Sequence, residues 1–250
     1  MNKIFKLIDN AVKVNSKCGV YLSGGVDSTI VLHHLAEKST EKIHTYSAKF
    51  GVESDESEKA KKIAEHYGTI HKTIEVTNFV DMLEKTMQFF KLPRYNIWPY
   101  YLAQEAKKDG IEYIYIGEGG DEHFGGYSNR GFLEAWANQL ILINETYVEI
   151  HNHLDLKLEK PFYLLDYRDT LKYYKPPKKE LLLEAYKGLL PKEVVSSSPA
   201  FSHESNYTML WNKEVKKFFP GYEPGCLQDI RNKFQELATL FWINRNKEEK

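Results

Sequence analysis

The sequence predicts an α/β fold, with a doubly wound parallel sheet followed by a mainly helical C-terminal part. In the first half of the chain, short apolar runs of strand length alternate with amphipathic segments of helical period. Strands that alternate with helices in this way form parallel sheets through crossover connections. In the second half, the sequence becomes helical in pattern, rich in aromatic residues and interrupted by prolines. This pattern predicts a helical subdomain packed over the carboxyl edge of the sheet.

Four strands are predicted in the first half, at residues 18–22, 43–50, 71–76 and 113–117. An amphipathic helix precedes them. The first helix after a strand begins at residue 28, and further helices are predicted at residues 55–67, 78–90 and 99–110. Asn78 is a residue type that caps helices, and Pro99 suits a first helical turn. Gly68 and Gly110 adopt backbone conformations that end a helix.

Composition and charge exclude several classes of function. The 250 residues carry a net charge of −1, so no general field attracts the chain to nucleic acid or to an anionic membrane. The two cysteines, Cys18 and Cys226, form no CxxC pair, which argues against a zinc ribbon and a disulfide framework. There is no signal-peptide pattern and no run of 18 apolar residues. We therefore expect a cytoplasmic protein without membrane contact.

A glycine-rich hexapeptide, SGGVDS at residues 23–28, joins the first predicted strand to its helix. Its glycines let the backbone approach an anion closely. The amides at the helix start, together with the hydroxyls of Ser23 and Ser28, supply donors for a phosphate. Asp27 would repel that phosphate unless it holds Mg²⁺, which takes oxygen ligands from carboxylates and phosphates alike. The hexapeptide therefore predicts a phosphate site with a metal ion.

A second glycine-rich loop, GEGGDEHFGGY at residues 117–127, follows the fourth predicted strand. The carboxyl ends of parallel strands meet at one edge of a sheet, where doubly wound folds bind ligands. Both loops are therefore expected at the same edge. Asp121 can then supply a second carboxylate to Mg²⁺, opposite Asp27.

These motifs resemble those of a known family. The first loop looks like the PP-loop of ATP pyrophosphatases, and the second resembles the GEGxDExFGGY segment of asparagine synthetases and the related β-lactam-forming synthetases. Residues 55–76 and 189–195 are similar to further segments of that family. The resemblance implies one synthetase domain, with a PP-loop (adenine nucleotide α-hydrolase-like) ATP-binding core at residues 1–130 and a helical part at residues 131–250.

The resemblance also implies a site and a reaction. Family adenine contacts fall at Leu22, Ala48 and Gly117, and phosphate contacts fall at Ser23, Gly24, Gly25, Asp27 and Ser28. The catalytic glutamate falls at Glu118, and a tyrosine near the intermediate falls at Tyr127. The implied ligase uses ATP and Mg²⁺ to convert a carboxylate into an acyl-adenylate and pyrophosphate. Ammonia or an amine then attacks the acyl group.

The chain departs from the family in three places. It reaches the first loop by residue 23, which leaves no room for the glutaminase domain of glutamine-dependent enzymes. The family's late lysine is absent from residues 196–202, so Lys49 or Lys192 would have to replace it. The family's Glu and Arg in ExRxPFLD have become Lys157 and Glu159. We therefore expect an acceptor other than aspartate, with a separate glutaminase subunit and a homo-oligomer left open as partners.

Two other functions stay open at this stage. One is a PP-loop enzyme that modifies tRNA or a cofactor, against which the second loop and the lack of paired cysteines count. The other is a nucleotide-binding subunit that is inactive alone, which the missing late lysine favours. Among the histidines, His123 inside the second loop is the candidate for a functional role, whereas His151 and His153 fit a solvated turn better than a metal site.

Overall fold

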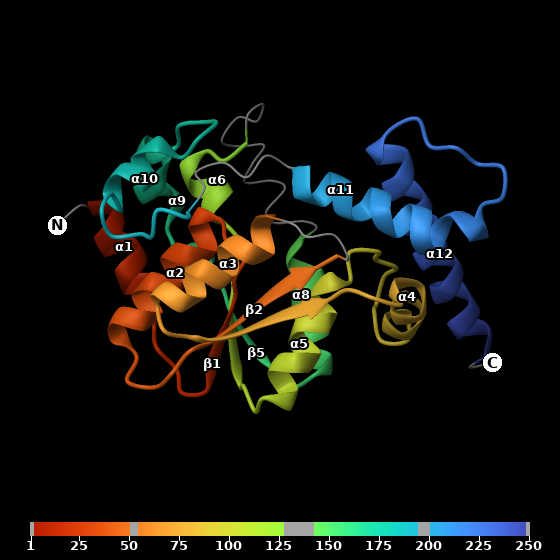
Figure 1. Ribbon diagram of the computed structural model, residues 1–250, viewed down its shortest axis with the longest axis horizontal. Coiled ribbons are helices and arrows are strands. Elements are labelled where there is room, and N and C mark those ends of the chain that lie inside the picture. The colour runs from red at the N-terminus through yellow and green to blue at the C-terminus, as the bar shows by residue number, and fades with distance from the viewer. Residues whose placement is uncertain (1–2, 51–54, 128–142, 195–200, 249–250) are drawn as a thin grey trace.

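The computed structural model describes residues 3–50, 55–127, 143–194 and 201–248, and its centre is a parallel sheet of five strands in the order β3-β2-β1-β4-β5 (Figure 1). The strands are β1 (Cys18–Tyr21), β2 (His44–Lys49), β3 (Ile70–Glu75), β4 (Tyr113–Tyr115) and β5 (Lys157–Glu159). Because β2 and β3 lie on one side of β1 and β4 and β5 on the other, the strand order reverses between β1 and β4. The predicted parallel α/β fold is confirmed.

The fifth strand is not among the predicted ones. Three residues long, it contributes a lysine and a glutamate, so the sequence shows no apolar run there. Its place comes from pairing with β4, in which Tyr113 lies opposite Lys157 and Tyr115 opposite Glu159. The amide of Ile116 then donates to the carbonyl of Glu159 over 3.1 Å. A segment of the C-terminal half therefore completes the sheet beside the second loop.

One face of the sheet is covered by α1 (Lys3–Ala11), α2 (Val26–Lys38) and α3 (Asp55–His66). Their apolar side chains join Val20 and Tyr115 of the sheet in one buried cluster. In α2 nearly every side chain from Val26 to Leu35 is buried, because the helix lies between the sheet and two other helices (Figure 1). This packing fixes the first turn of α2, which contains the last three residues of the hexapeptide.

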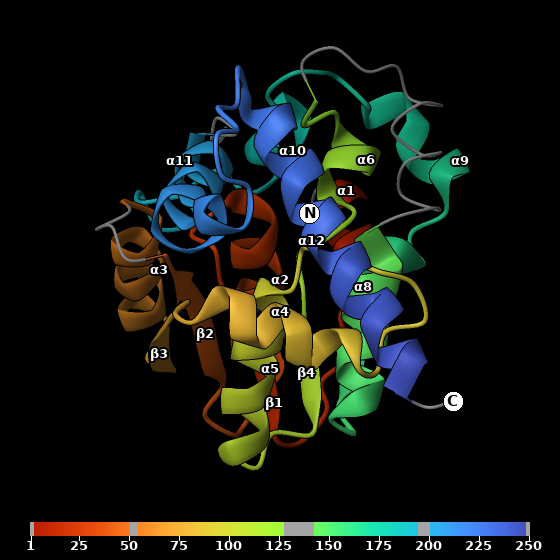
Figure 2. The ribbon, with the colours of Figure 1, turned by 90° about the vertical axis from the view of Figure 1, so that its right-hand side faces the viewer.

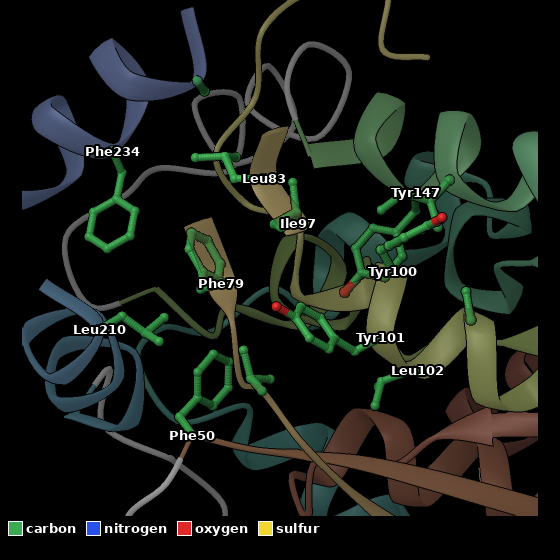
Figure 3. Packing of buried hydrophobic residues seen from close by; sticks show 14 of the residues in the cluster. Phe50, Phe79, Leu83, Ile97, Tyr100, Tyr101, Leu102, Tyr147, Leu210 and Phe234 are labelled. Atoms are coloured by element: carbon green, nitrogen blue, oxygen red, sulfur yellow. The ribbon is translucent and has the colours of Figure 1, made fainter. Parts of the chain in front are cut away.

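The other face is covered by α4 (Phe79–Met87), α5 (Trp98–Lys108) and α8 (Ile143–His153), on which α11 (Phe201–Leu210) and α12 (Leu227–Glu248) pack (Figure 2). Figure 3 shows Phe79 and Leu83 of α4 facing Leu210 of α11 and Phe234 of α12. The C-terminal helices thus lie beside the sheet, against α4. Short elements complete the fold: α6 (Gly120–Phe124), η1 (Pro161–Leu164), α9 (Tyr167–Thr170), η2 (Leu171–Tyr173), α10 (Glu180–Ala185), η3 (Trp211–Val215) and η4 (Lys216–Phe218).

Helix α2 begins at Val26 instead of residue 28, and α4 differs from the predicted helix at both ends. Asn78 occupies the N-cap position of α4, but its backbone is left-handed, with φ of 50°, and its side chain makes no capping hydrogen bond. That helix ends at Met87 instead of residue 90. In contrast, α5 ends at Lys108 before Gly110, whose φ of 74° suits glycine. Within the described ranges, no helix combines the length and the apolar character needed to cross a membrane.

Candidate active site

The two glycine-rich loops meet at the carboxyl ends of β1 and β4, the neighbouring strands between which the strand order reverses. Their backbones approach so closely that side chains are excluded. A Cβ on Gly117 would lie 2.5 Å from the backbone nitrogen of Ser28, and a Cβ on Gly120 would overlap the carboxylate of Asp27. The predicted juxtaposition of Asp27 with the second loop is therefore present, at the position where doubly wound folds bind ligands.

The hexapeptide forms a tight turn that leads into α2. Gly24 has φ of 79°, and a Cβ there would lie 3.2 Å from the carbonyl oxygen of Glu56. The hydroxyl of Ser28 donates to the carbonyl of Gly25 over 3.2 Å and lies 3.2 Å from the hydroxyl of Ser23. Among the residues that the structure describes, no side chain caps the start of α2 at Gly25. A helix start of this kind presents backbone N–H groups to an anion.

A lysine lies between the two predicted metal ligands. The ammonium of Lys179 pairs with a carboxylate oxygen of Asp27 and lies 2.5 Å from Oδ1 of Asp121. Its side chain is 7% exposed, against 17% for Asp27 and 40% for Asp121. Lys179 is the N-cap of α10 and has φ of 52°, a left-handed conformation that side-chain-bearing residues rarely adopt. Strained backbone of this kind clusters at functional sites.

The charges of this cluster do not balance, because two carboxylates face one ammonium. Burial raises the pKa of Asp27 despite the opposing effect of Lys179, and the charge of Asp121 adds to the rise. Burial alone would lower the pKa of Lys179, but the two carboxylates outweigh it and raise that pKa. Oδ1 of Asp27 is buried and has no hydrogen-bond partner among the described residues. A buried carboxylate oxygen without a donor is a ready ligand for a hard cation.

The paired glycines of the second loop are needed for this geometry. A Cβ on Gly126 would overlap the carboxylate of Asp121 and lie 2.6 Å from Cε of Lys179. Gly125 has φ of 80°, and a Cβ there would lie 2.5 Å from the backbone of Lys175. The FGGY segment is therefore the surface against which Lys179 and its preceding loop pack.

Glu118 lies close to the same cluster. Burial raises its pKa to about 7, and the nearby charges of Glu122, Asp121 and Asp27 add to the rise. The hydroxyl of Tyr127 donates to Oε1 of Glu122 over 2.6 Å. Glu118 and Tyr127, the two residues predicted to act in catalysis, thus both interact electrostatically with Asp121 and Glu122.

The predicted adenine contacts lie at the ends of three neighbouring strands. Leu22 follows β1, and its backbone is already engaged: its amide donates to the carbonyl of Tyr46 over 2.9 Å, and its carbonyl accepts from the hydroxyl of Ser47 over 2.6 Å. Ala48 lies in β2 and Gly117 after β4, and both are partly exposed. Adenine binding by these residues remains a prediction.

The late-lysine segment and two histidines were also singled out in the sequence. The late lysine was sought at residues 196–202, of which residues 196–200 lie outside the described residues. His123 is fully buried, with Nδ1 2.7 Å from the hydroxyl of Thr170, and burial lowers its pKa to about 4. His151 lies in the core rather than in a solvated turn. In the parts of the chain that the structure describes, no three His, Cys, Asp or Glu side chains cluster as a metal site.

The family model that matches this chain is asparagine synthase, over residues 4–173. A glutamine-hydrolysing asparagine synthetase of Asparagus officinalis is 34% identical over 126 residues, which are 44% of this chain and 21% of that protein. The glutamine-hydrolysing asparagine synthetase 2 of Oryza sativa subsp. japonica is 31% identical over 128 residues, 44% of this chain and 21% of that protein. Amidase chry2 of Gibberella zeae is 29% identical over 145 residues, 50% of this chain and 22% of that protein. The match spans about a fifth of the length of these relatives.

Among solved structures, the chain is similar to the NH3-dependent NAD synthetase of Campylobacter jejuni. The two share 14% sequence identity, with a TM-score of 0.37 over 94% of this chain and 92% of that one.

Proposed function

Since the chain belongs to the asparagine synthase family, we propose that it is an ATP-dependent carbon–nitrogen ligase that forms AMP and pyrophosphate. In the first step, a carboxylate oxygen of the acceptor attacks the α-phosphorus of ATP, and pyrophosphate leaves. In the second step, ammonia or an amine attacks the acyl carbon, AMP leaves with the acceptor's oxygen, and the nitrogen loses a proton. The observation that carries this proposal is the cluster of Asp27, Lys179 and Asp121 between the two loops.

The hexapeptide would bind the β- and γ-phosphates. The open start of α2 offers backbone N–H groups, and the hydroxyls of Ser23 and Ser28 lie together at its entrance. Lys179 supplies a positive charge at the same place, in the role for which the sequence suggested Lys49 or Lys192. Since an ammonium is a compact point charge with three donors, it can follow the pyrophosphate as that group leaves.

The residues fit a magnesium ion. Asp27 and Asp121 would hold it, and the unpartnered Oδ1 of Asp27 supports this assignment. A bound Mg²⁺ offsets the negative charge that gathers on the leaving pyrophosphate. The carboxylates of Asp27, Asp121 and Glu122 interact electrostatically with one buried lysine, and Glu118 interacts with all three carboxylates. Without a further cation such a site would repel the nucleotide.

Glu118 is the residue proposed to take the proton from the attacking nitrogen. A base works best when its pKa is near the working pH, and burial raises the pKa of the Glu118 carboxyl to about 7. Tyr127, linked to Glu122, would contact the intermediate from the same loop. Both roles rest on the family resemblance together with the proximity of these groups to Asp27.

The acceptor is proposed to be a carboxylate other than aspartate. The residue at the family's glutamate position, Lys157, donates to the hydroxyl of Tyr113 over 2.9 Å at the start of β4. The arginine position holds Glu159, which ends β5. Lys157 is exposed at the edge of the sheet opposite the two loops, so the proposal rests on the change at Glu159. A site in which a charged group has changed sign binds the original substrate less well.

The test is isotope exchange between labelled pyrophosphate and ATP over a panel of carboxylic acids. At least one acid should support exchange, and Asp27→Asn should abolish it while keeping the fold, because the amide preserves shape but removes the anionic ligand. A matched control is Asp155→Asn, which alters an aspartate whose side chain is fully exposed. Exchange at the wild-type rate in Asp27→Asn would contradict the metal role. No exchange with any acid would favour the alternative of a nucleotide-binding subunit that is inactive alone.

A further inference from the structure

Helices α2 and α10 are joined at two points that have the same spacing on both helices. In the first turn of α2, Asp27 pairs with Lys179, the N-cap of α10. Seven residues further along α2, Nε2 of His34 lies 2.6 Å from the hydroxyl of Tyr186, the C-cap of α10, which is itself seven residues after Lys179. Seven residues span two helical turns, about 10 Å along the axis. The two contacts therefore hold both ends of α10 against one face of α2.

The imidazole of His34 is buried, and each of its nitrogens has its own partner. The residue is 1% exposed, and its Nδ1 lies 3.0 Å from Oδ1 of Asp9 in α1. Burial lowers the pKa of His34 to about 4, so the ring is neutral and only one nitrogen carries a proton. Since the ionised carboxylate can only accept, Nδ1 donates to Asp9, and Nε2 accepts from the hydroxyl of Tyr186.

The carboxylate at the far end of this series is also fixed. Lys38 of α2 lies with its ammonium 2.8 Å from Oδ1 of Asp9 and donates to the backbone carbonyl of Val12 over 2.9 Å. The ring of Phe5, from α1, packs 4.7 Å from that of His34 and 5.3 Å from that of Tyr186, measured between centroids. A buried network in which every donor faces an acceptor has one preferred arrangement. The three helices α1, α2 and α10 are thereby joined behind the phosphate loop.

We propose that His34 and Tyr186 are positioning residues for Lys179, a role that rests on the function proposed above. Helix α10 has six residues, too few to be stable through its own hydrogen bonds, so its contacts set its position. By holding the C-terminal end of α10, the pair of His34 and Tyr186 sets where the Lys179 ammonium meets the pyrophosphate. Both residues lie about two helical turns from the phosphate loop, so they act through the helix and not on the ligand.

The first experiment is a double-mutant cycle of Tyr186→Phe and Lys179→Met. The probe is inorganic pyrophosphate with Mg²⁺, and its Kd is measured by calorimetry. Tyr186→Phe leaves a buried imidazole nitrogen without its donor, and it should raise the Kd about 3- to 10-fold, the range for one hydrogen bond. In the Lys179→Met background the same change should have no further effect, because the ammonium that it displaces is absent. A full effect in that background would overturn the positioning role.

The matched control is Tyr67→Phe. The hydroxyl of Tyr67, which follows α3, lies 3.2 Å from Nδ1 of His33, the residue next to His34 in α2. The change removes a tyrosine hydroxyl that joins a different helix to α2 and leaves the contacts of α10 in place. The Kd for pyrophosphate should therefore stay at the wild-type value. An equal loss of affinity in Tyr67→Phe would overturn the inference, because the effect would then come from a disturbance of α2 alone.

A second measurement needs no ligand. Nitrogen-15 NMR of the lysine ammonium groups reports the surroundings of Lys179, whose resonance is the one lost in Lys179→Met. This resonance should move in Tyr186→Phe and stay in Tyr67→Phe. A resonance that does not move in Tyr186→Phe overturns the inference. If the resonance moves but the wild-type protein binds no pyrophosphate, the positioning of Lys179 is supported and the proposed function alone fails.

Discussion

The lysine between the two aspartates gives the most quantitative prediction. Lys179→Met removes the ammonium but keeps a side chain of similar length. The carboxylates of Asp27 and Asp121 then face each other without a counter-charge. Removing one partner of a buried ion pair costs about 3–5 kcal/mol. Since the Asp121 side chain is 40% exposed and well screened, we take the lower end, about 3 kcal/mol, for the loss of unfolding free energy.

Magnesium should distinguish this variant from the wild type. In the wild type, the ammonium stands between the carboxylates, so Mg²⁺ without nucleotide should leave the unfolding curve unchanged. In Lys179→Met, the two free carboxylates can bind the ion, which at 100 times its Kd would restore about 2.7 kcal/mol.

The assay is equilibrium urea denaturation with and without Mg²⁺. The control is Lys187→Met, which breaks a surface pair with Glu184 whose side chains are 77% and 67% exposed. Its unfolding free energy should change by less than about 0.5 kcal/mol. A loss below about 1 kcal/mol in Lys179→Met would refute the account of the ion cluster. Equal stabilisation of wild type and variant by Mg²⁺ would refute it as well.

Three further predictions concern the site. Gly126→Ala should weaken ATP binding about 10-fold or more, measured by calorimetry, because the new methyl overlaps the Asp121 carboxylate. The control is Gly188→Ala, where a Cβ meets nothing within 4 Å, and it should keep the wild-type affinity for ATP. The rate of amide formation should rise with pH through about 7, because Glu118 is protonated below its raised pKa and becomes a base above it. The same pH profile in Glu118→Gln would exclude Glu118 as the base. With ATP, Mg²⁺ and aspartate, the protein should form no asparagine from glutamine and little from ammonia, measured by chromatography; robust synthesis from glutamine would contradict both parts.

Local sequence was sufficient to predict the sheet and its two loops. Each loop is one continuous segment at the end of a strand, so its position follows from the alternation of strands and helices. Asp27 and Asp121 could be paired in advance because parallel strands end at one edge. The need for glycine at 117 and 120 was not predicted, because it arises only where the backbones of two distant segments meet.

Lys179 could not be predicted in the same way. Lys179 is 152 residues from its partner Asp27 and caps a helix of six residues, so no periodic pattern marks it. The sequence of β5 gives no strand signal either, because its polar residues are placed by pairing with β4. Each of these features depends on tertiary contacts between distant segments.

The central claim is that the carboxylate of the acceptor is joined to the α-phosphorus of ATP. The most direct test uses the acid that supports pyrophosphate exchange, with both carboxylate oxygens replaced by oxygen-18. After reaction with ATP, Mg²⁺ and hydroxylamine, the nucleotide products are analysed by mass spectrometry. The account predicts AMP that carries one oxygen-18, with unlabelled pyrophosphate. Formation of ADP with oxygen-18 in inorganic phosphate, or of AMP without the label, would contradict it.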